Sequence, residues 1–246
     1  MQQPKVLLGI NYYSGKDDAR AKYLDRFLES IYRKTSYVNY DVVIFDDLSP
    51  HLIPQHTDVV TKIERPKKPG VRWHIVRNRM FKYFLENKEY DYLFAYDEDY
   101  EIVRDNWMVR LVQLMENIPE AGIIGSHWAR LEDGTTRQKQ HAPIGTLVGK
   151  NGFQVFTNKY VTGGCWTMRR DVLETIGLFP EDGSVIYDNG HPGADTYYSW
   201  KMMEETDYKL CTVEIDLTMH TGQEFMRGKF KHKYNTPEFQ AGERLY

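Results

Sequence analysis

The sequence predicts an α/β fold with a mixed, mainly parallel sheet flanked by helices. Strand-like apolar runs alternate with amphipathic helical periodicity through the first half of the chain. An acidic cluster, Asp97-Glu98-Asp99, directly follows the apolar run at residues 92–96, which is typical of a buried parallel strand. Ligands of open α/β sheets bind beyond the carboxyl ends of the strands, so this cluster is the first candidate site.

The elements of the first half follow from the spacing of apolar residues. Tyr23, Leu24, Phe27, Leu28 and Ile31 repeat at three- and four-residue intervals, as one face of a helix does. Asp105 is expected to cap the helix at 107–117, and Pro119 to end it. In order, we expect a strand at 6–10, a helix at 19–33, a strand at 40–45, a helix at 71–85, a strand at 92–96, a helix at 107–117 and a strand at 121–125.

The second half breaks this alternation. Residues 127–160 are rich in Gly, Thr and Lys and predict hairpins and loops. Gly177 is expected to end a short helix in the left-handed conformation. The tail after His220 has no clear period and is interpreted either as a lid or as a solvated terminus. The other elements expected are a strand at 163–168, a helix at 171–176, a helix at 195–205 and a strand at 211–215.

Composition narrows the class of protein. With 246 residues the chain is long enough for one large core, and its net charge of −3 argues against general nucleic-acid binding. No apolar stretch approaches the roughly 20 residues that span a bilayer, and no secretory leader is recognisable. Cys165 and Cys211 are expected to be buried and reduced. We therefore expect a cytoplasmic protein, at most peripheral to the inner face of a membrane; the sequence does not indicate its oligomeric state.

Alternation of side chains along the strand turns Asp97 and Asp99 to one side and Glu98 to the other. Two neighbouring carboxylates repel each other unless water or a divalent cation lies between them, and hard oxygen ligands suit Mg²⁺ or Mn²⁺. The alternative is a solvated acidic turn. The usual motifs of phosphate-binding loops, dinucleotide folds, zinc proteases and serine hydrolases are missing from the sequence. What remains is a series of polar sites at strand and helix ends: Asp46-Asp47, Asp97-Glu98-Asp99, Asp195 and His220.

With these sites in this order along the sequence, the chain resembles the family-2 glycosyltransferases. Their GT-A fold is a Rossmann-like fold of nucleotide-diphospho-sugar transferases. The resemblance implies a single domain over 1–246, with a nucleotide-sugar-binding half at about 1–126, an acceptor half at about 127–220 and a flexible basic tail at about 221–246. The similar segments are Val42–Ser49 with its Asp-Asp-x-Ser, Gly70 with Val76-Arg77-Asn78, the Asp-x-Asp motif at 97–99, the acceptor-side segment 163–179 with Arg169-Arg170, Gly193-Ala194-Asp195, and Met219-His220.

The resemblance also implies roles on the donor side. Asp47 and Asp46 would contact the nucleobase, and Ile10 and Arg77 the nucleotide-sugar. Asp97 would face the ribose and the metal, and Asp99 and His220 would bind the metal. The implied cofactor is Mn²⁺ or Mg²⁺, the implied donor is a nucleotide-diphosphate sugar, and the acceptor is a glycan or another hydroxyl compound. For single residues, plainer alternatives remain: a surface position for Arg77, a structural role for His220, and a core position rather than an acceptor platform for Trp166.

On the acceptor side, Asp195 matches the family's catalytic base and implies an inverting transfer. A carboxylate opposite the leaving group can accept the proton of the acceptor hydroxyl, and a helix N-terminus favours its ionised form. The alternative is an ordinary N-cap. Glu181, Asp182 and Asp188 are the reserve candidates.

The chain also departs from the family pattern. Ile10-Asn11-Tyr12-Tyr13 replaces Pro-x-Tyr-Asn, and no glutamate precedes Asp195. A Gln-x-x-Arg-Trp motif is missing, which disfavours a processive synthase. A nucleotidyltransferase and an inactive GT-A-like binding module remain as alternative functions.

Overall fold

A computed structural model describes residues 3–14, 19–50, 57–67, 73–125, 130–131, 143–161, 163–181, 194–213 and 217–221. The helices are α1 (Ala19–Lys34), α2 (Trp73–Glu86), α3 (Trp107–Asn117), α4 (Arg170–Ile176) and α5 (Ala194–Glu205), with short 3₁₀ turns at η1 (Thr57–Val59) and η2 (Lys150–Gly152). The strands are β1 (Val6–Tyr12), β2 (Tyr40–Asp46), β3 (Lys62–Glu64), β4 (Tyr92–Asp97), β5 (Tyr100–Ile102), β6 (Ala121–Gly125), β7 (Arg130–Leu131), β8 (Gly145–Val148), β9 (Gln154–Asn158), β10 (Cys165–Arg169), β11 (Lys209–Thr212) and β12 (Thr218–His220).

The central sheet is mixed and mainly parallel, as predicted. Its strand order over the described residues is β3-β2-β1-β4-β10-β6-β11-β9-β8. β1 pairs in parallel with β2 and β4, whereas β10 lies antiparallel between β4 and β6. Among these strands only β10 and β9 run against the rest. The carboxyl ends of β1, β2 and β4 therefore meet at one edge, beside the start of β10.

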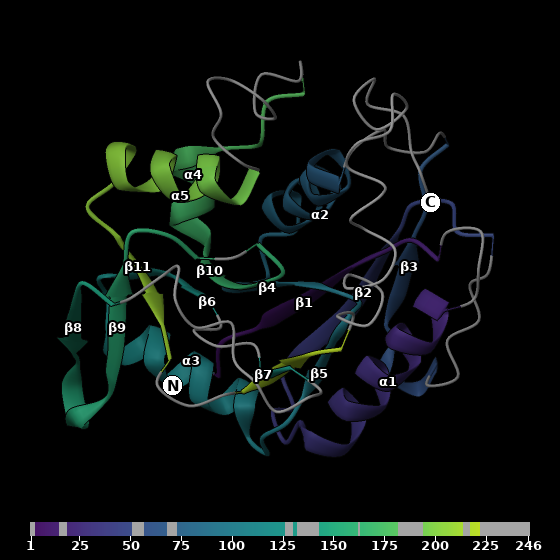
Figure 1. Ribbon diagram of the computed structural model, residues 1–246, viewed down its shortest axis with the longest axis horizontal. Coiled ribbons are helices and arrows are strands. Elements are labelled where there is room, and N and C mark those ends of the chain that lie inside the picture. The colour runs from purple at the N-terminus through teal and green to yellow at the C-terminus, as the bar shows by residue number, and fades with distance from the viewer. Residues whose placement is uncertain are drawn as a thin grey trace.

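Helices cover both faces of this sheet. In Figure 1, α2, α4 and α5 lie on one face and α1 and α3 on the other. Alternate side chains of β1 enter the two core layers: Val6, Leu8 and Ile10 pack with α1 and α3, and Leu7 packs with α2. Gly9 also faces α2, where an added Cβ would lie 2.7 Å from the sulfur of Met80. A side chain at this position would therefore force Met80 to move.

A second, three-stranded sheet begins directly after the Asp-x-Asp turn. Its order is β5-β12-β7, and β12 runs antiparallel to β5. β5 begins directly after Asp99, so the last described strand returns to the acidic cluster. This return was not predicted, because no periodicity distinguishes such short strands.

Several predicted boundaries need correction. The cap of α3 is Asn106, in a left-handed conformation with φ 57°, and not Asp105, whose carboxylate accepts a hydrogen bond from Lys34. Gly177 has the expected positive φ of 68°, but its ψ of −154° lies outside the left-handed helical region. β11 begins two residues earlier than predicted, at Lys209. The predicted helix start at 71, the strand end at 214–215, most of the tail after His220 and the reserve candidates Asp182 and Asp188 lie outside the described residues.

Two composition-based expectations can be compared with this fold. Cys165 and Cys211 are both buried and free, as predicted. Within the ranges given above, no helix is long and apolar enough to cross a membrane.

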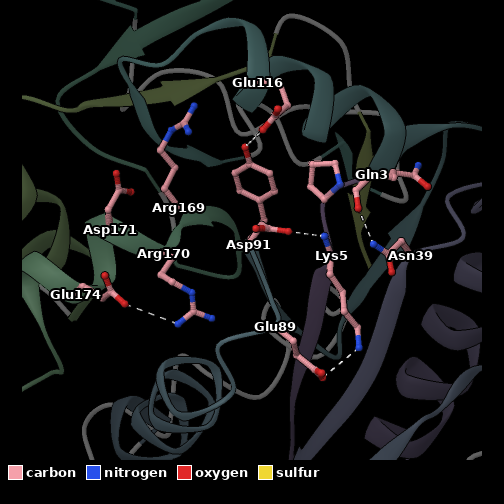
Figure 2. A pocket seen from close by; sticks show the side chains of 12 residues that line it. Gln3, Lys5, Asn39, Glu89, Asp91, Glu116, Arg169, Arg170, Asp171 and Glu174 are labelled. Carbon is pink, nitrogen blue, oxygen red and sulfur yellow. Dashed lines mark hydrogen bonds and ion pairs between the residues drawn. The ribbon is translucent and has the colours of Figure 1, made fainter. Parts of the chain in front are cut away.

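The edge of the sheet opposite the acidic cluster carries a charged pocket of about 930 Å³ (Figure 2). Most of the charged groups in this pocket form ion pairs with one another or hydrogen bonds with the main chain. Lys5 pairs with Glu89 at 3.0 Å, and Arg170 donates to the carbonyl groups of Phe84, Asn87 and Tyr90. Arg169 likewise donates to the carbonyl group of Ile118, at the end of α3, and to that of Ala121, at the start of β6. The two arginines of the acceptor-side segment thus hold helix ends, away from the candidate site.

We predict that Arg170→Met lowers the free energy of unfolding by about 1–3 kcal/mol, because buried carbonyl groups lose their hydrogen-bond donor. Arg110→Met, an exposed arginine on α3, should change it by no more than about 0.5 kcal/mol. Urea denaturation measures both variants. Equal effects of the two substitutions would contradict the assigned role of Arg170.

Candidate functional site

Three neighbouring strands deliver polar side chains to one edge of the sheet. In the parallel registers, Tyr12 of β1 pairs with Asp46 of β2, and Asn11 pairs with Asp97 of β4. The predicted strand-end residues are therefore brought together, because carboxyl ends of parallel strands share an edge. Ile10, the preceding residue of β1, is fully buried in the core beneath this edge. Its predicted contact with the donor stays a prediction.

Asp46 shapes the turn after β2. Its Oδ1 accepts a hydrogen bond from the Ser49 N–H at 3.0 Å, and Arg65 Nε lies 2.6 Å from Oδ2. Leu48 within this turn has a φ of 61°. The Ser49 hydroxyl in turn accepts a hydrogen bond from the Ser14 N–H at 2.9 Å, which ties the loops after β1 and β2 together. Asp-x-x-Ser is thus a turn motif here, whatever else Asp46 contacts.

Asp47 is fully buried beside an arginine that the sequence analysis did not single out. Arg79 of α2 contacts the Asp47 Oδ1 at 3.1 Å. The main-chain N–H of Asp47 donates to the Tyr12 carbonyl at 3.0 Å. Burial lowers the pKa of Arg79, while the carboxylates of Asp46 and Glu64 oppose this change. The predicted nucleobase contact of Asp47 stays a prediction.

Asp97 is held by a buried cation. Arg77 Nη2 lies 2.6 Å from Asp97 Oδ1, to which Asn11 Nδ2 also donates at 3.4 Å. The Arg77 side chain is fully buried and lies 5.3 Å from the ring of Trp166, which is itself in the core. The surface alternative for Arg77 and the acceptor platform for Trp166 are therefore wrong, and the predicted donor contact of Arg77 stays a prediction. Burial raises the pKa of Asp97, and the Arg77 charge opposes that rise.

Glu98 serves a different purpose from its neighbours. It is 4% exposed and pairs with Arg20 of α1 at 2.8 Å. Burial raises its pKa to about 8, and the Arg20 guanidinium opposes this rise. The ion pair ties the acidic turn to α1, so Glu98 anchors the turn while Asp97 contacts α2.

The chain returns to Asp99 through β12. The Thr221 N–H donates to the Asp99 carbonyl at 2.7 Å, and His220 pairs with Tyr100 in the short antiparallel ladder. Gly164 permits this arrangement, because a Cβ there would lie 2.5 Å from the Tyr100 hydroxyl. The main chain thus brings the three predicted metal ligands Asp97, Asp99 and His220 to one place. The side chain of His220 is not among those that the structure describes. The side chains that it does describe form no cluster of three metal-binding groups.

Asp195 lies in the first turn of α5, one residue after the helix begins at Ala194. Its carboxylate accepts hydrogen bonds from the Tyr160 hydroxyl and, at 3.1 Å, from the Gly163 N–H. The carboxylate therefore holds the segment that leads into β10, and the N-cap interpretation is wrong. Tyr160 was not singled out in the sequence, because nothing local marks a tyrosine 35 residues away as its partner.

Gly163 links the two aspartates. Its carbonyl accepts a hydrogen bond from Arg77 Nη1, and its N–H donates to Asp195. The Asp97 N–H also donates to the Gly164 carbonyl at 2.9 Å. A continuous path of hydrogen bonds therefore runs from Asp97 through Arg77 and Gly163 to Asp195. Of the reserve candidates, Glu181 instead contacts Lys82 and Asn78 of α2.

Comparison with known proteins decides the family. The model of glycosyl transferase family 2 matches residues 18–177. The chain belongs to this family. A search of curated protein sequences gives no match.

Solved structures support the GT-A fold of this family-2 chain. S. aureus TarS 1-349 has a TM-score of 0.60 and 14% identity, covering 91% of this chain and 62% of its own. The same protein with UDP-GlcNAc gives 0.59 and 12%, covering 87% and 58%. GalNAc-T7 with UDP, GalNAc and Mn²⁺ gives 0.62 and 15%, covering 88% and 43%. This chain thus spans less than two thirds of each of these structures.

Proposed function

We propose that this protein is a metal-dependent glycosyltransferase that moves a sugar from a nucleotide-diphosphate sugar to a hydroxyl acceptor with inversion, and that Asp195 is the base. The observation that carries the proposal is the path of hydrogen bonds that joins the donor-side Asp97 to Asp195 through Gly163. Family membership and the nucleotide complexes of TarS and GalNAc-T7 support the donor class.

The carboxyl edge of the sheet is the proposed donor site. Asp47 and Asp46 would face the nucleobase, and Asp97 the ribose. Asp99, Asp97 and His220 would hold Mn²⁺ or Mg²⁺, for which carboxylate and imidazole groups are suitable ligands. When bound, the ion neutralises charge that develops on the diphosphate leaving group. The single-domain division into donor half, acceptor half and basic tail belongs to the same proposal.

The acceptor side is assigned to Asp195. Transfer with inversion needs a proton acceptor on the face of the anomeric carbon opposite the diphosphate. Asp195 lies across the Gly163 segment from Asp97 and is held in place, which suits that role. For the alternative of a nucleotidyltransferase, the loop after β1 lacks the Gly-rich, basic sequence that triphosphates require. An inactive binding module would have no need of a fixed base.

We predict that Asp99→Ala weakens the binding of UDP-GlcNAc in the presence of Mn²⁺ by roughly 10-fold or more and makes it insensitive to the metal, because a metal ligand is lost. Asp105→Ala removes an exposed carboxylate six residues away and should bind as the wild type does. Calorimetric titration with and without chelator provides the measurement. Wild-type binding that chelator leaves unchanged would contradict the metal assignment.

We predict that Asp195→Asn loses roughly 10²–10⁴-fold in turnover while it keeps its donor affinity, because a general base acts in the transition state only. Asp207→Asn, at an exposed position after α5, is the matched control. NMR of the product should show the anomeric configuration opposite to that of the donor. Retention of configuration, or near-normal turnover of Asp195→Asn, would contradict the assignment of Asp195 as the base of an inverting transfer.

A further inference from the structure

The Asp195 carboxylate is held through a single oxygen atom. The Tyr160 hydroxyl and the Gly163 N–H both donate to Oδ2. Within the part of the chain that the structure describes, Oδ1 accepts no hydrogen bond. Two donors on one oxygen fix the plane of a carboxylate, and hydrogen bonds to an ionised acceptor are the strong ones. The two oxygens of Asp195 are therefore unequal.

The position of Tyr160 is itself determined by α5. Tyr160 follows β9, and the next residue, Val161, donates its N–H to the Ser199 hydroxyl at 3.4 Å. Ser199 lies one helical turn after Asp195 and is 1% exposed, so both side chains project from the same face of the helix. Tyr160, Val161 and Gly163 are thus each bonded to α5, at two successive turns, so the phenol hydroxyl is placed by the same helix that carries Asp195.

We propose that Tyr160 is a positioning residue that holds Asp195 so that Oδ1 takes the proton of the acceptor. This inference rests on the proposed function. In the step, the acceptor oxygen forms a bond to the anomeric carbon, and the bond from that carbon to the diphosphate oxygen breaks. The acceptor proton passes to Oδ1, and the nucleoside diphosphate leaves with the bonding electron pair. Tyr160 exchanges no proton and keeps its hydrogen bond to Oδ2 throughout.

Kinetics test this role with a double-mutant cycle. The variants are Tyr160→Phe, Asp195→Asn and the double variant, with UDP-GlcNAc and Mn²⁺ as the probe and release of UDP to water as the readout. Tyr160→Phe should lower kcat by roughly 10–100-fold with unchanged donor affinity, because a small misplacement of a reacting group costs that much. The double variant should be no slower than Asp195→Asn alone, because the tyrosine acts only through that carboxylate.

Tyr208→Phe is the matched control. Its hydroxyl donates to the Asp171 carboxylate at the opposite edge of the sheet, so the same chemical group is removed from another tyrosine–aspartate pair. This variant should turn over as the wild type does. Near-normal kcat in Tyr160→Phe, or additive losses in the double variant, would overturn the positioning role while leaving Asp195 as the base. Near-normal turnover of Asp195→Asn would instead remove the proposed base, and the inference with it.

NMR spectroscopy tests the contact between Tyr160 and Asp195 without any donor. With ¹³C-labelled aspartate carboxyl groups, the Asp195 signal is the one missing from Asp195→Asn. Tyr160→Phe should move this signal, whereas Tyr208→Phe should move the Asp171 signal and leave that of Asp195 in place. An Asp195 signal that does not respond to Tyr160→Phe would overturn the proposal.

Discussion

The arrangement of the site depends on one buried cation, the guanidinium of Arg77. Its side chain is fully buried against Trp166. Burying an unpaired charge costs far more than most interactions contribute, so the fold must bring a carboxylate and a carbonyl to it. Asp97 at the end of β4 and Gly163 before β10 meet that requirement. The cation therefore sets the position of the segment that leads into β10 relative to the Asp-x-Asp turn.

This constraint connects the two sides of the site. Gly163 uses its carbonyl for Arg77 and its N–H for Asp195, so one residue holds the partners of both aspartates. Two further contacts hold the acidic turn. Glu98 ties the acidic turn to α1 through Arg20, and Thr221 ties it to β12. A transferase needs such rigidity, because proximity and orientation contribute only when the reacting groups are already placed.

The strand ends and the order of acidic sites could be predicted from the sequence, because hydrophobic periodicity and the edge rule of parallel sheets are local or topological. The partners of those acidic residues could not. Arg77 and Gly163 are 86 residues apart, and Asp195 and Tyr160 are 35 apart. A surface position was an alternative for Arg77 because a lone arginine that opens a helix is usually exposed, yet its partners Asp97 and Gly163 lie on either side of the antiparallel pairing of β4 with β10. Asp105 failed as a cap because Asn106 can adopt the left-handed conformation at that corner.

Arg77 holds the protein's own chain at the edge of the sheet where we propose that the donor binds. A crystal structure with Mn²⁺ and UDP-GlcNAc would show whether both statements hold. We expect the diphosphate and the metal at Asp99, with Arg77 still bonded to Asp97 and to the Gly163 carbonyl. Nucleotide bound in the charged pocket at the opposite edge, or Arg77 released from both Asp97 and the Gly163 carbonyl, would contradict this expectation.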